Sequence, residues 1–508
     1  MDVLLGPLKV ADSAWRSQRQ SCTVWPNCID QLTGQMLDRP PEERPPTRVG
    51  GVMASLKARI ESRALAPGAR LPSVRALAGT LAVSKSTVVE AYERLVAEGE
   101  VTARRGAGFF VAGPRRPLVL AQSLERREPI ADWLRSHRAA LAADPDVVQP
   151  GSGWLPESWM PEVGIQRALR DLARDRAFRK THYDSAAGYE PLRRQLAVRL
   201  GERGVVVAPE QIVLTDSTTQ SIDLAMRFFV QPGDVVVVDD PSYFRLLPLL
   251  KAHRVDVVAA PLTREGPDVA ALAELFAARA PRLYLTVAAF HNPTGLSLTP
   301  AVAHRILKLV ERHQVIVIED EIFADFEPGP PGTRLAAFDG LERVIQVGSY
   351  SKTVSAALRC GYLALRPEWV DPIVDLKLAT ALSSGHFAAA FLHLMLTEAG
   401  YRRHLAALRA RLADAMGRTL VRLKSAGLTP WTEPRGGIFV WARLPDGLDA
   451  AAIARLALDE GVGLAPGPVF SVAADAPAYL RFNAAASLSP GNFDTLERAM
   501  ANPAARLA

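Results

Sequence analysis

Apolar residues follow two different periodicities along this chain. On the N-terminal side they recur about one helical turn apart, first at Val52, Leu56 and Ile60, which predicts an amphipathic helix. From about residue 147 onward, short apolar runs rich in valine and isoleucine alternate with helical patterns. Such alternation is typical of α/β proteins, in which helices cover both faces of a largely parallel sheet. The chain is therefore predicted to be multidomain, with a small helical region ahead of a large α/β body.

Two further helices and a pair of strands are predicted between residues 49 and 113. Ser73 and Ser84 stand where N-caps are expected, each ahead of an apolar face. The third helix would turn four residues inward: Val88, Ala91, Tyr92 and Leu95. Gly99 ends it, and the stretch 101–111, with glycines at its centre, predicts a two-stranded wing. A winged helix–turn–helix of this kind places a recognition helix in the DNA major groove. A small three-helix bundle with another role is the alternative.

The charge distribution favours DNA binding. The net charge of the chain is +6, and Lys and Arg outnumber Asp and Glu between residues 50 and 113. Four of these cations stand at the predicted helix starts and in the wing: Arg75, Lys85, Arg104 and Arg105. Cations concentrated at one end of a chain indicate a polyanionic partner for that end. The predicted partner is double-stranded DNA.

Five apolar runs are predicted as strands of the α/β body: Ile212–Leu214, Val235–Val238, Leu283–Val287, Val315–Ile318 and Val344–Ile345. Ligands of such sheets bind beyond the carboxyl ends of the strands. Polar and aromatic residues follow each run in turn: Ser217 and Thr218, Tyr243, Asn292, Asp320 and Lys352. Each alone has an ordinary structural explanation, such as a helix cap or a turn, but five at successive strand ends favour one site.

Lys352 carries the most specific chemistry of this set. It stands among small hydroxyl residues, in Ser349-Tyr350-Ser351-Lys352, close to the end of a buried strand. An ammonium is costly there unless it is paired or neutralised. Forming an imine with an aldehyde cofactor is one known use of such a lysine, and a lysine that extends its amine to solvent is the alternative.

Composition places these regions in a globular protein. The 508 residues are 48% hydrophobic and 22% charged, and no apolar run reaches the roughly 18–20 residues of a membrane span. Three cysteines make neither a disulfide framework nor a complete metal site. No secretion signal is recognised, and a cytoplasmic location is predicted. Residues 1–48 are predicted to be an extension of unassigned role, and the charged stretch 114–145 a linker.

The region 49–113 resembles the GntR family of winged-helix regulators. The resemblance rests on the runs Arg70–Ala78 and Val83–Val88 and on the Arg105-Gly106-x-Gly108 wing. It implies that a set of residues at the helix starts and in the wing faces the DNA: Arg75, Ser84, Lys85, Ser86, Thr87, Arg105 and Gly106.

Residues 146–508 resemble the aspartate aminotransferase fold of pyridoxal-phosphate enzymes, fold type I, with a small C-terminal subdomain from about residue 395. The resemblance implies pyridoxal 5'-phosphate as cofactor, bound as an imine to Lys352. Asp320 would pair with the pyridinium nitrogen, Asn292 would bind the phenolic oxygen, and Tyr243 would stack on the ring. The implied phosphate ligands are Ser217, Thr218, Thr219, Ser349 and Arg359.

Two further roles and one departure follow from the same resemblance. Tyr183 would reach the phosphate of the neighbouring subunit in a homodimer with shared sites. Arg481 would clamp a substrate α-carboxylate through two hydrogen bonds. Three residues after the pyridine-binding acid, where the family usually has a tyrosine, this chain has Phe323. Transaminase activity is therefore expected to be weak.

The two resemblances together are those of the MocR subfamily of transcription regulators. They imply a regulator that senses an amino acid or related amine by external aldimine formation at Lys352, without a metal or a membrane. A working aminotransferase with an appended DNA-binding head is the first alternative. A plain repressor whose body has lost its chemistry is the second, and the presence of Lys352, Asp320, Asn292 and Arg359 argues against it.

Overall fold

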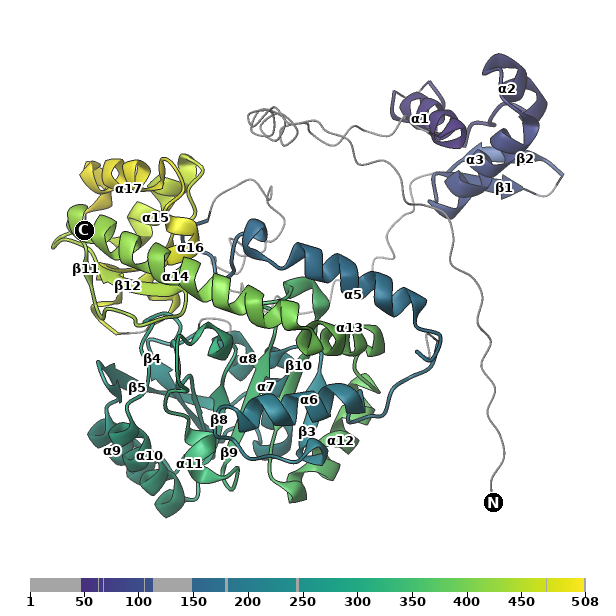
Figure 1. Ribbon diagram of the computed structural model, residues 1–508. Coiled ribbons are helices and arrows are strands. Elements are labelled where there is room, and N and C mark those ends of the chain that lie inside the picture. The colour runs from purple at the N-terminus through teal and green to yellow at the C-terminus, as the bar shows by residue number, and fades with distance from the viewer. Residues whose placement is uncertain are drawn as a thin grey trace, which may run out of the picture. The chain divides into compact units, whose positions relative to one another are not determined.

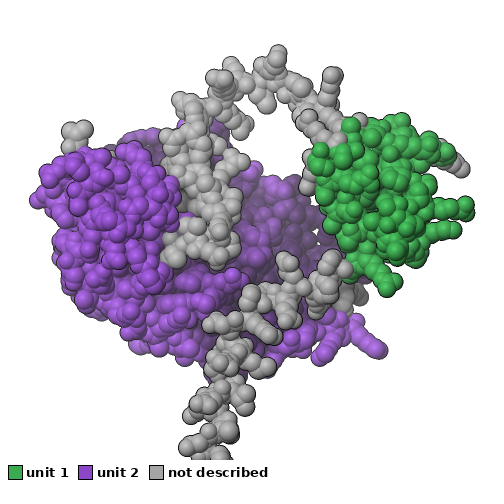
Figure 2. Space-filling view, turned by 90° about the horizontal axis from the view of Figure 1, so that it is seen from above, with its two compact units in different colours: residues 1–129 green, residues 130–508 purple. Residues whose placement is uncertain are grey.

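The computed structural model describes residues 47–112 and 149–506, apart from residues 63, 67, 105, 179–180, 244–245 and 472. The chain divides into two compact units, residues 1–129 and 130–508, coloured separately in Figure 2. Almost all of the predicted extension and the whole predicted linker lie outside the described residues.

The smaller unit is a three-helix domain with a two-stranded wing. Its elements are α1 (Arg48–Glu61), α2 (Val74–Thr80), α3 (Lys85–Ala97), β1 (Val101–Arg104) and β2 (Gly108–Val111). The two predicted N-caps are confirmed, because Ser73 accepts a hydrogen bond from the Ala76 amide and Ser84 accepts one from the Thr87 amide. The strands β1 and β2 are antiparallel, as expected of a wing.

One face of α3 forms the core of this unit. The predicted inward residues Val88, Ala91, Tyr92 and Leu95 are all buried. The Tyr92 hydroxyl donates to the Pro72 carbonyl at 2.7 Å, and the Tyr92 ring lies 4.7 Å from that of Phe109 in the wing. Tyr92 therefore ties the recognition helix both to the segment before α2 and to the wing.

The larger unit is built on an eight-stranded mixed sheet in the order β3-β10-β9-β8-β7-β4-β5-β6. The strands are β3 (Ile212–Thr215), β4 (Val235–Asp240), β5 (Asp256–Thr263), β6 (Gly266–Pro267), β7 (Leu283–Thr286), β8 (Ile316–Asp320), β9 (Val344–Ser349) and β10 (Gly361–Ala364). Strands β5, β4, β7, β8 and β9 are parallel, while β10 is antiparallel to both β3 and β9. All five predicted strands are present, and the prediction of a largely parallel sheet is confirmed.

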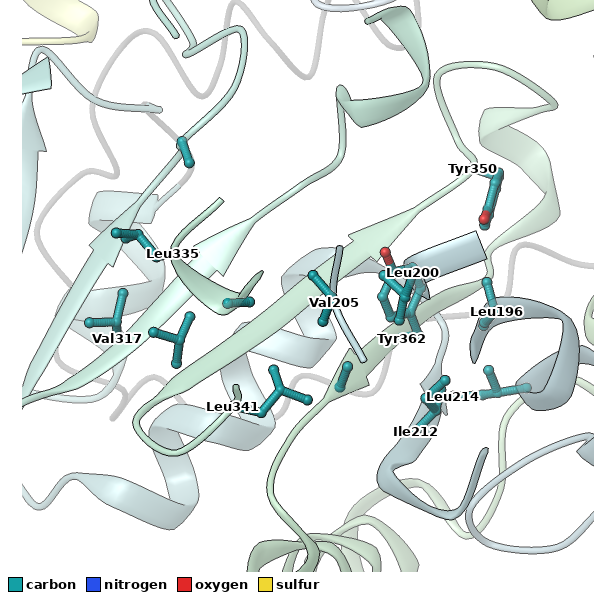
Figure 3. Close-up of a cluster of buried hydrophobic side chains, with 14 of the residues drawn as sticks. Leu196, Leu200, Val205, Ile212, Leu214, Val317, Leu335, Leu341, Tyr350 and Tyr362 are labelled. Carbon is teal, nitrogen blue, oxygen red and sulfur yellow. The ribbon is translucent and has the colours of Figure 1, made fainter. Parts of the chain in front are cut away.

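Helices cover both faces of this sheet (Figure 1). The helices of the larger unit before the C-terminal lobe are α5 (Glu162–Arg174), α6 (Glu190–Gly201), α7 (Thr218–Phe229), α8 (Leu246–Ala252), α9 (Val269–Arg279), α10 (Pro300–His313), α11 (Leu335–Asp339), α12 (Pro367–Ala381) and α13 (His386–Thr397). One core lies between the sheet and α6, α9, α10 and α13, and the other between the sheet and α7, α8 and α12. Figure 3 shows part of the first core, in which Leu196 and Leu200 of α6 lie near Ile212 and Tyr362 of the sheet.

A C-terminal lobe follows, in the stretch for which a small subdomain is predicted. The 27-residue helix α14 (Ala399–Ser425) leads into an antiparallel sheet of order β11-β12-β14-β13. The remaining elements are β11 (Thr429–Pro430), β12 (Phe439–Arg443), α15 (Ala450–Asp459), β13 (Ala465–Pro466), β14 (Tyr479–Asn483), α16 (Ala484–Ser487) and α17 (Asn492–Ala501). No helix in the described ranges is long and apolar enough to cross a membrane.

Candidate active site and nucleic-acid interface

Lys352 lies three residues beyond the end of β9. Its Nζ donates a hydrogen bond to the Gly153 carbonyl at 2.6 Å. The residues on either side of Ser351-Lys352 are both fixed: the Tyr350 hydroxyl accepts from Arg199 Nε at 3.0 Å, and the Thr353 hydroxyl lies 2.9 Å from that of Tyr401. The backbone that carries the amine is therefore held by side chains beneath it.

These supporting side chains meet at the buried carboxylate of Asp325. One of its oxygens accepts from Arg199 at 2.9 Å and also from Arg203, and the other accepts from the Tyr401 hydroxyl at 2.6 Å. Burial alone would raise the pKa of Asp325, but the two arginines outweigh it and lower the pKa to about 2. The carboxylate is thus charged at any physiological pH. It holds together helix α6, the loop that carries Lys352 and helix α14. The sequence analysis did not find Asp325, because it has the ordinary appearance of a surface acid.

Asp320 is the last residue of β8, and its carboxylate accepts from the Ile322 amide at 3.0 Å. Burial raises the pKa of this carboxyl to about 7; the nearby Glu321 charge adds to the effect, while the Ile322 amide and Lys352 act against it. A carboxyl of this kind gains most from a cationic partner placed against it. A protonated ring nitrogen would be such a partner.

A small cleft lies beside Asp320. Its polar lining is Asp239, Ser242, Tyr243, Thr286, His291 and Asp320, and its apolar lining is Ile222, Leu246, Leu285, Val287 and Ile318. The structure therefore brings Tyr243 and Asp320 to one cavity, as the sequence predicts. Apolar walls with a few convergent polar groups are typical of cofactor and ligand sites.

The cleft also contains two residues that were not assigned a role from the sequence. Asp239, at the end of β4, is buried and accepts from the Tyr284 hydroxyl at 2.6 Å and the Thr286 hydroxyl at 2.7 Å. His291 Nε2 lies 3.5 Å from the same carboxylate. The signal for Asp239 was its position at a strand end beside the cleft, the same signal that identified Asp320.

The start of α7 has the features of an anion site. Ser217 is the N-cap of the helix, and the Thr218 hydroxyl is buried without a hydrogen-bond partner among the described residues. A Cβ added to Gly361 would lie 2.6 Å from the Ser217 carbonyl carbon and 2.9 Å from the Thr218 amide nitrogen. Only glycine therefore allows β10 to pass so close to this helix start. Free amides and an unpartnered hydroxyl at a helix N-terminus fit a phosphate group.

The other predicted phosphate ligands are Ser349 at the end of β9, Arg359 just before β10 and Thr219 in α7 itself. The Ser349 hydroxyl lies 3.0 Å from that of Ser351. Arg359, two residues before β10, and Thr219, in the first turn of α7, are exposed. Side chains exposed at strand ends and a helix start are accessible to an anion from solution.

Arg481 of β14 is buried without a carboxylate partner in the described chain. Its Nη1 donates to Asn292 Oδ1 at 2.8 Å and its Nη2 to the Gly151 carbonyl at 2.5 Å. Its guanidinium carbon lies 4.5 Å from the ring centroid of Phe439 and 4.7 Å from that of Phe470, and no described atom accepts from its Nε. Burial lowers the pKa of Arg481 to about 9. A buried cation lacking a counter-charge fits a site for an anionic ligand.

Two further predicted positions differ sharply in environment. Tyr183 is 81% exposed, so in a single chain it contacts no phosphate site. Phe323 is buried, and its ring packs edge-on against that of Phe439 at 5.3 Å. The position at which the resemblance leads one to expect a tyrosine is thus filled by a packed apolar ring.

The predicted DNA-facing residues lie on the surface of the smaller unit. Arg75, Ser84, Lys85 and Ser86 are exposed at the starts of α2 and α3. Thr87 is half-buried, and its hydroxyl lies 2.8 Å from that of Ser84. In the wing, Gly106 adopts a positive φ of 75° that favours glycine. Arg105 lies outside the described residues.

Comparison with known proteins identifies a family for each of the two units of the chain. Residues 160–500 match the family model for aminotransferase class I and II, and residues 49–111 match that for bacterial regulatory proteins of the gntR family. The uncharacterized HTH-type transcriptional regulator YjiR of Escherichia coli is 29% identical over 87% of this chain and 96% of its own length. Aromatic-amino-acid aminotransferase 1 of Thermococcus litoralis is 29% identical over 68% of this chain and 84% of its own.

A solved structure gives the same picture for the larger unit. LysN, an α-aminoadipate aminotransferase of Thermus thermophilus complexed with N-(5'-phosphopyridoxyl)-L-leucine, superposes with a TM-score of 0.64 at 27% identity. The match covers 73% of this chain and 98% of that one. The body of the chain therefore has the fold of pyridoxal-phosphate aminotransferases, as the sequence predicts.

The raised pKa of Asp320 gives a testable dependence of stability on pH. The pKa is about 7 in the folded protein and about 3.9 in an unfolded chain. The folded state therefore keeps this proton to higher pH, and the stabilisation present below about pH 4 is lost as the pH rises to about 7. In ligand-free protein, we expect the free energy of unfolding of wild type relative to Asp320→Asn to fall across this window and then level off. Urea denaturation at a series of pH values measures the difference, and a flat or rising difference would contradict the raised pKa.

Proposed function

Because this chain belongs to the aminotransferase class I and II family and carries a gntR-family domain at its N-terminal side, we propose that it is a pyridoxal-phosphate-dependent transcription regulator of the MocR type. Its smaller unit binds double-stranded DNA, and its body senses an amino acid or related amine. The single observation that carries the proposal is the joint presence of Lys352, Asp320 and a buried Arg481 that has no carboxylate partner among the described residues, in a body attached to a winged helix. The proposal includes a cytoplasmic location, because the protein would act on DNA there.

The residues around the cleft fit the cofactor. Pyridoxal 5'-phosphate supplies an aldehyde that condenses reversibly with amines. The helix start at Ser217 and Thr218, with the orphaned Thr218 hydroxyl, accommodates its phosphate, assisted by Thr219, Ser349 and Arg359. Lys352 supplies the amine that holds it.

Three residues would tune and orient the ring. Asp320, whose carboxyl is destabilised as an anion by burial, would keep its charge by facing a protonated ring nitrogen. Tyr243 would present its ring face from the lining of the cleft. Asn292 accepts from Arg481 through its oxygen, which leaves its amide nitrogen as a donor to the phenolic oxygen.

Arg481 points to the chemical class of the effector. A buried guanidinium between the rings of Phe439 and Phe470 binds a planar anion in preference to a cation or a neutral amine. An α-amino acid offers both an amine for exchange with Lys352 and a carboxylate for Arg481. We therefore place α-amino acids first among the effectors.

A second copy of the chain would complete the site. Tyr183 is exposed, and so are Leu378, Leu382 and Phe387 in and around the neighbouring helices α12 and α13. Exposed apolar side chains of this size gathered around one loop favour a protein interface. In a homodimer Tyr183 would reach the phosphate of the partner subunit.

A working aminotransferase remains the second candidate, since one relative bears the name of an aromatic-amino-acid aminotransferase. Chemistry beyond the exchange of one amine for another requires proton transfer and a tuned ring. Phe323 provides no hydroxyl for the phenolic oxygen, whereas the groups needed for exchange and carboxylate binding are present. The sensor is therefore favoured over the efficient enzyme.

The first test concerns Lys352. We expect the purified protein to be yellow and Lys352→Ala to lack the visible band when it contains an equal amount of cofactor phosphate, because the band depends on the imine that this amine forms. Absorbance spectra measure the band. Lys308→Ala, which removes an exposed amine on α10, is the control and should keep the band. An unchanged band in Lys352→Ala would reject Lys352 as the imine lysine.

The second test concerns DNA. Lys85 is exposed at the first position of α3, where it can neutralise one phosphate. We expect Lys85→Ala to weaken operator binding and to reduce the slope of log K against log salt by about one unit. Lys57→Ala, at a lysine of α1 that pairs with Glu98 at 2.7 Å, is the matched control. If both variants bind like wild type at every salt concentration, Lys85 makes no phosphate contact.

The third test separates sensor from enzyme. We expect α-amino acids to shift the absorbance spectrum rapidly, with turnover far below the roughly 1–1000 per second of ordinary enzymes. Stopped-flow absorbance beside a keto-acid assay under the same conditions measures both. Rapid multiple turnover to keto acid would reject the sensor and favour the aminotransferase.

A further inference from the structure

A second lysine of the body is buried near the proposed phosphate site. Lys377, in α12, has none of its surface exposed, and its Nζ donates to the Ala186 carbonyl at 2.6 Å. A neutral side chain could fill this space at a much lower desolvation cost. The binding roles assigned above leave Lys377 unused.

The carboxylates around Lys377 come from two loops. Burial lowers the pKa of Lys377 to about 8, and the opposing influence comes mainly from Asp216 and Asp184, with a smaller one from Cys360. Asp216 directly precedes Ser217, and Cys360 stands between Arg359 and Gly361. Lys377 also bonds Ala186, and the next residue, Ala187, is bonded to Leu214, three residues before Ser217, so the ammonium lies near the helix start that fits a phosphate.

The other loop that Lys377 contacts is the one that carries Tyr183. Besides the hydrogen bond from Lys377 to Ala186, this loop is held by His386 Nδ1, which lies 2.9 Å from Asp184 Oδ2. The Ala187 carbonyl accepts from the Leu214 amide of β3 at 2.8 Å. A firmly anchored loop with a tip residue 81% exposed presents Tyr183 in a defined place.

We propose that Lys377 is a positioning residue for the cofactor phosphate: it supplies a buried positive charge near the helix start at Ser217 and fixes the loop that presents Tyr183. This inference rests on the proposed function. A buried charge is poorly screened, so it acts on a phosphate dianion more strongly than a surface lysine at the same distance. The charge of Lys377 would thereby stabilise the phosphate in its own subunit. The hydrogen bond of Lys377 would position Tyr183 for the phosphate of the partner subunit.

The test compares two ligands that differ only in the phosphate. Full-length protein freed of cofactor is titrated with pyridoxal 5'-phosphate and with pyridoxal, and the dissociation constants are taken from the visible band. For Lys377→Met we expect the dissociation constant for pyridoxal 5'-phosphate to rise about tenfold, as loss of one favourable charge interaction predicts. The constant for pyridoxal should change less than about twofold, because pyridoxal has no phosphate for the charge to act on. Lys308→Met, at the exposed lysine of α10, should match wild type for both ligands.

A second variant separates charge from hydrogen bonding and replaces the first if that does not fold. Lys377→Gln keeps a donor for the Ala186 carbonyl but has no charge, and we expect the same selective loss of affinity for pyridoxal 5'-phosphate. Equal losses for both ligands would overturn the proposal in favour of a packing role, and so would unchanged affinities. Wild-type protein that binds neither ligand would overturn the proposed function itself, whereas normal wild-type binding with unchanged Lys377 variants overturns this inference alone.

Discussion

The geometry around Lys352 depends on the carboxylate of Asp325. This carboxylate accepts hydrogen bonds from Arg199 of α6, from Arg203 in the turn after α6 and from Tyr401 of α14. The backbone carbonyl of Asp325 accepts one from Arg409 at 2.8 Å. Removing one partner of a buried ion pair typically costs about 3–5 kcal/mol, since the remaining charge stays buried. Here one carboxylate binds two guanidinium groups, so helix α6, the loop that carries Lys352 and the long helix α14 are held by the same buried charge.

Two buried arginines show how the fold distinguishes structure from site. Arg334 donates to Glu321 at 2.8 Å and to Glu327 at 2.7 Å, so its charge is fully balanced within the chain. Arg481 has an amide oxygen, a backbone carbonyl and two aromatic faces instead of a carboxylate. A protein that needed only a stable core would gain from pairing or replacing such a group. The imbalance at Arg481 supports the proposal that a ligand brings the missing negative charge.

Much of this could be predicted from the sequence, because the informative signals are local. Apolar runs identified five of the eight strands of the large sheet, and residues at or just beyond their ends identified Asp320 and Lys352. Strand β10 was not predicted, since it is short, begins with Gly361 and has no β-branched residue. The supporting contacts could not be predicted either: Lys377 and Ala186 are 191 residues apart, and Asp325 and Tyr401 are 76 apart. Only the folded sheet brings such residues together, and a buried Lys377 looks like any helical lysine in the sequence.

The hydrogen bonds of Lys352 and Arg481 converge on one short segment. Lys352 donates to the carbonyl of Gly153 at 2.6 Å, and Arg481 donates to that of Gly151 at 2.5 Å. An amino acid that replaced Lys352 on the cofactor would free the lysine amine for the Gly153 carbonyl, and its carboxylate would compete with the Gly151 carbonyl for Arg481. A ligand shifts a conformational equilibrium only through contacts that differ between the states. Under the proposed function these two carbonyls would be contacts of that kind, and they belong to the first described residues of the body after the stretch 113–148.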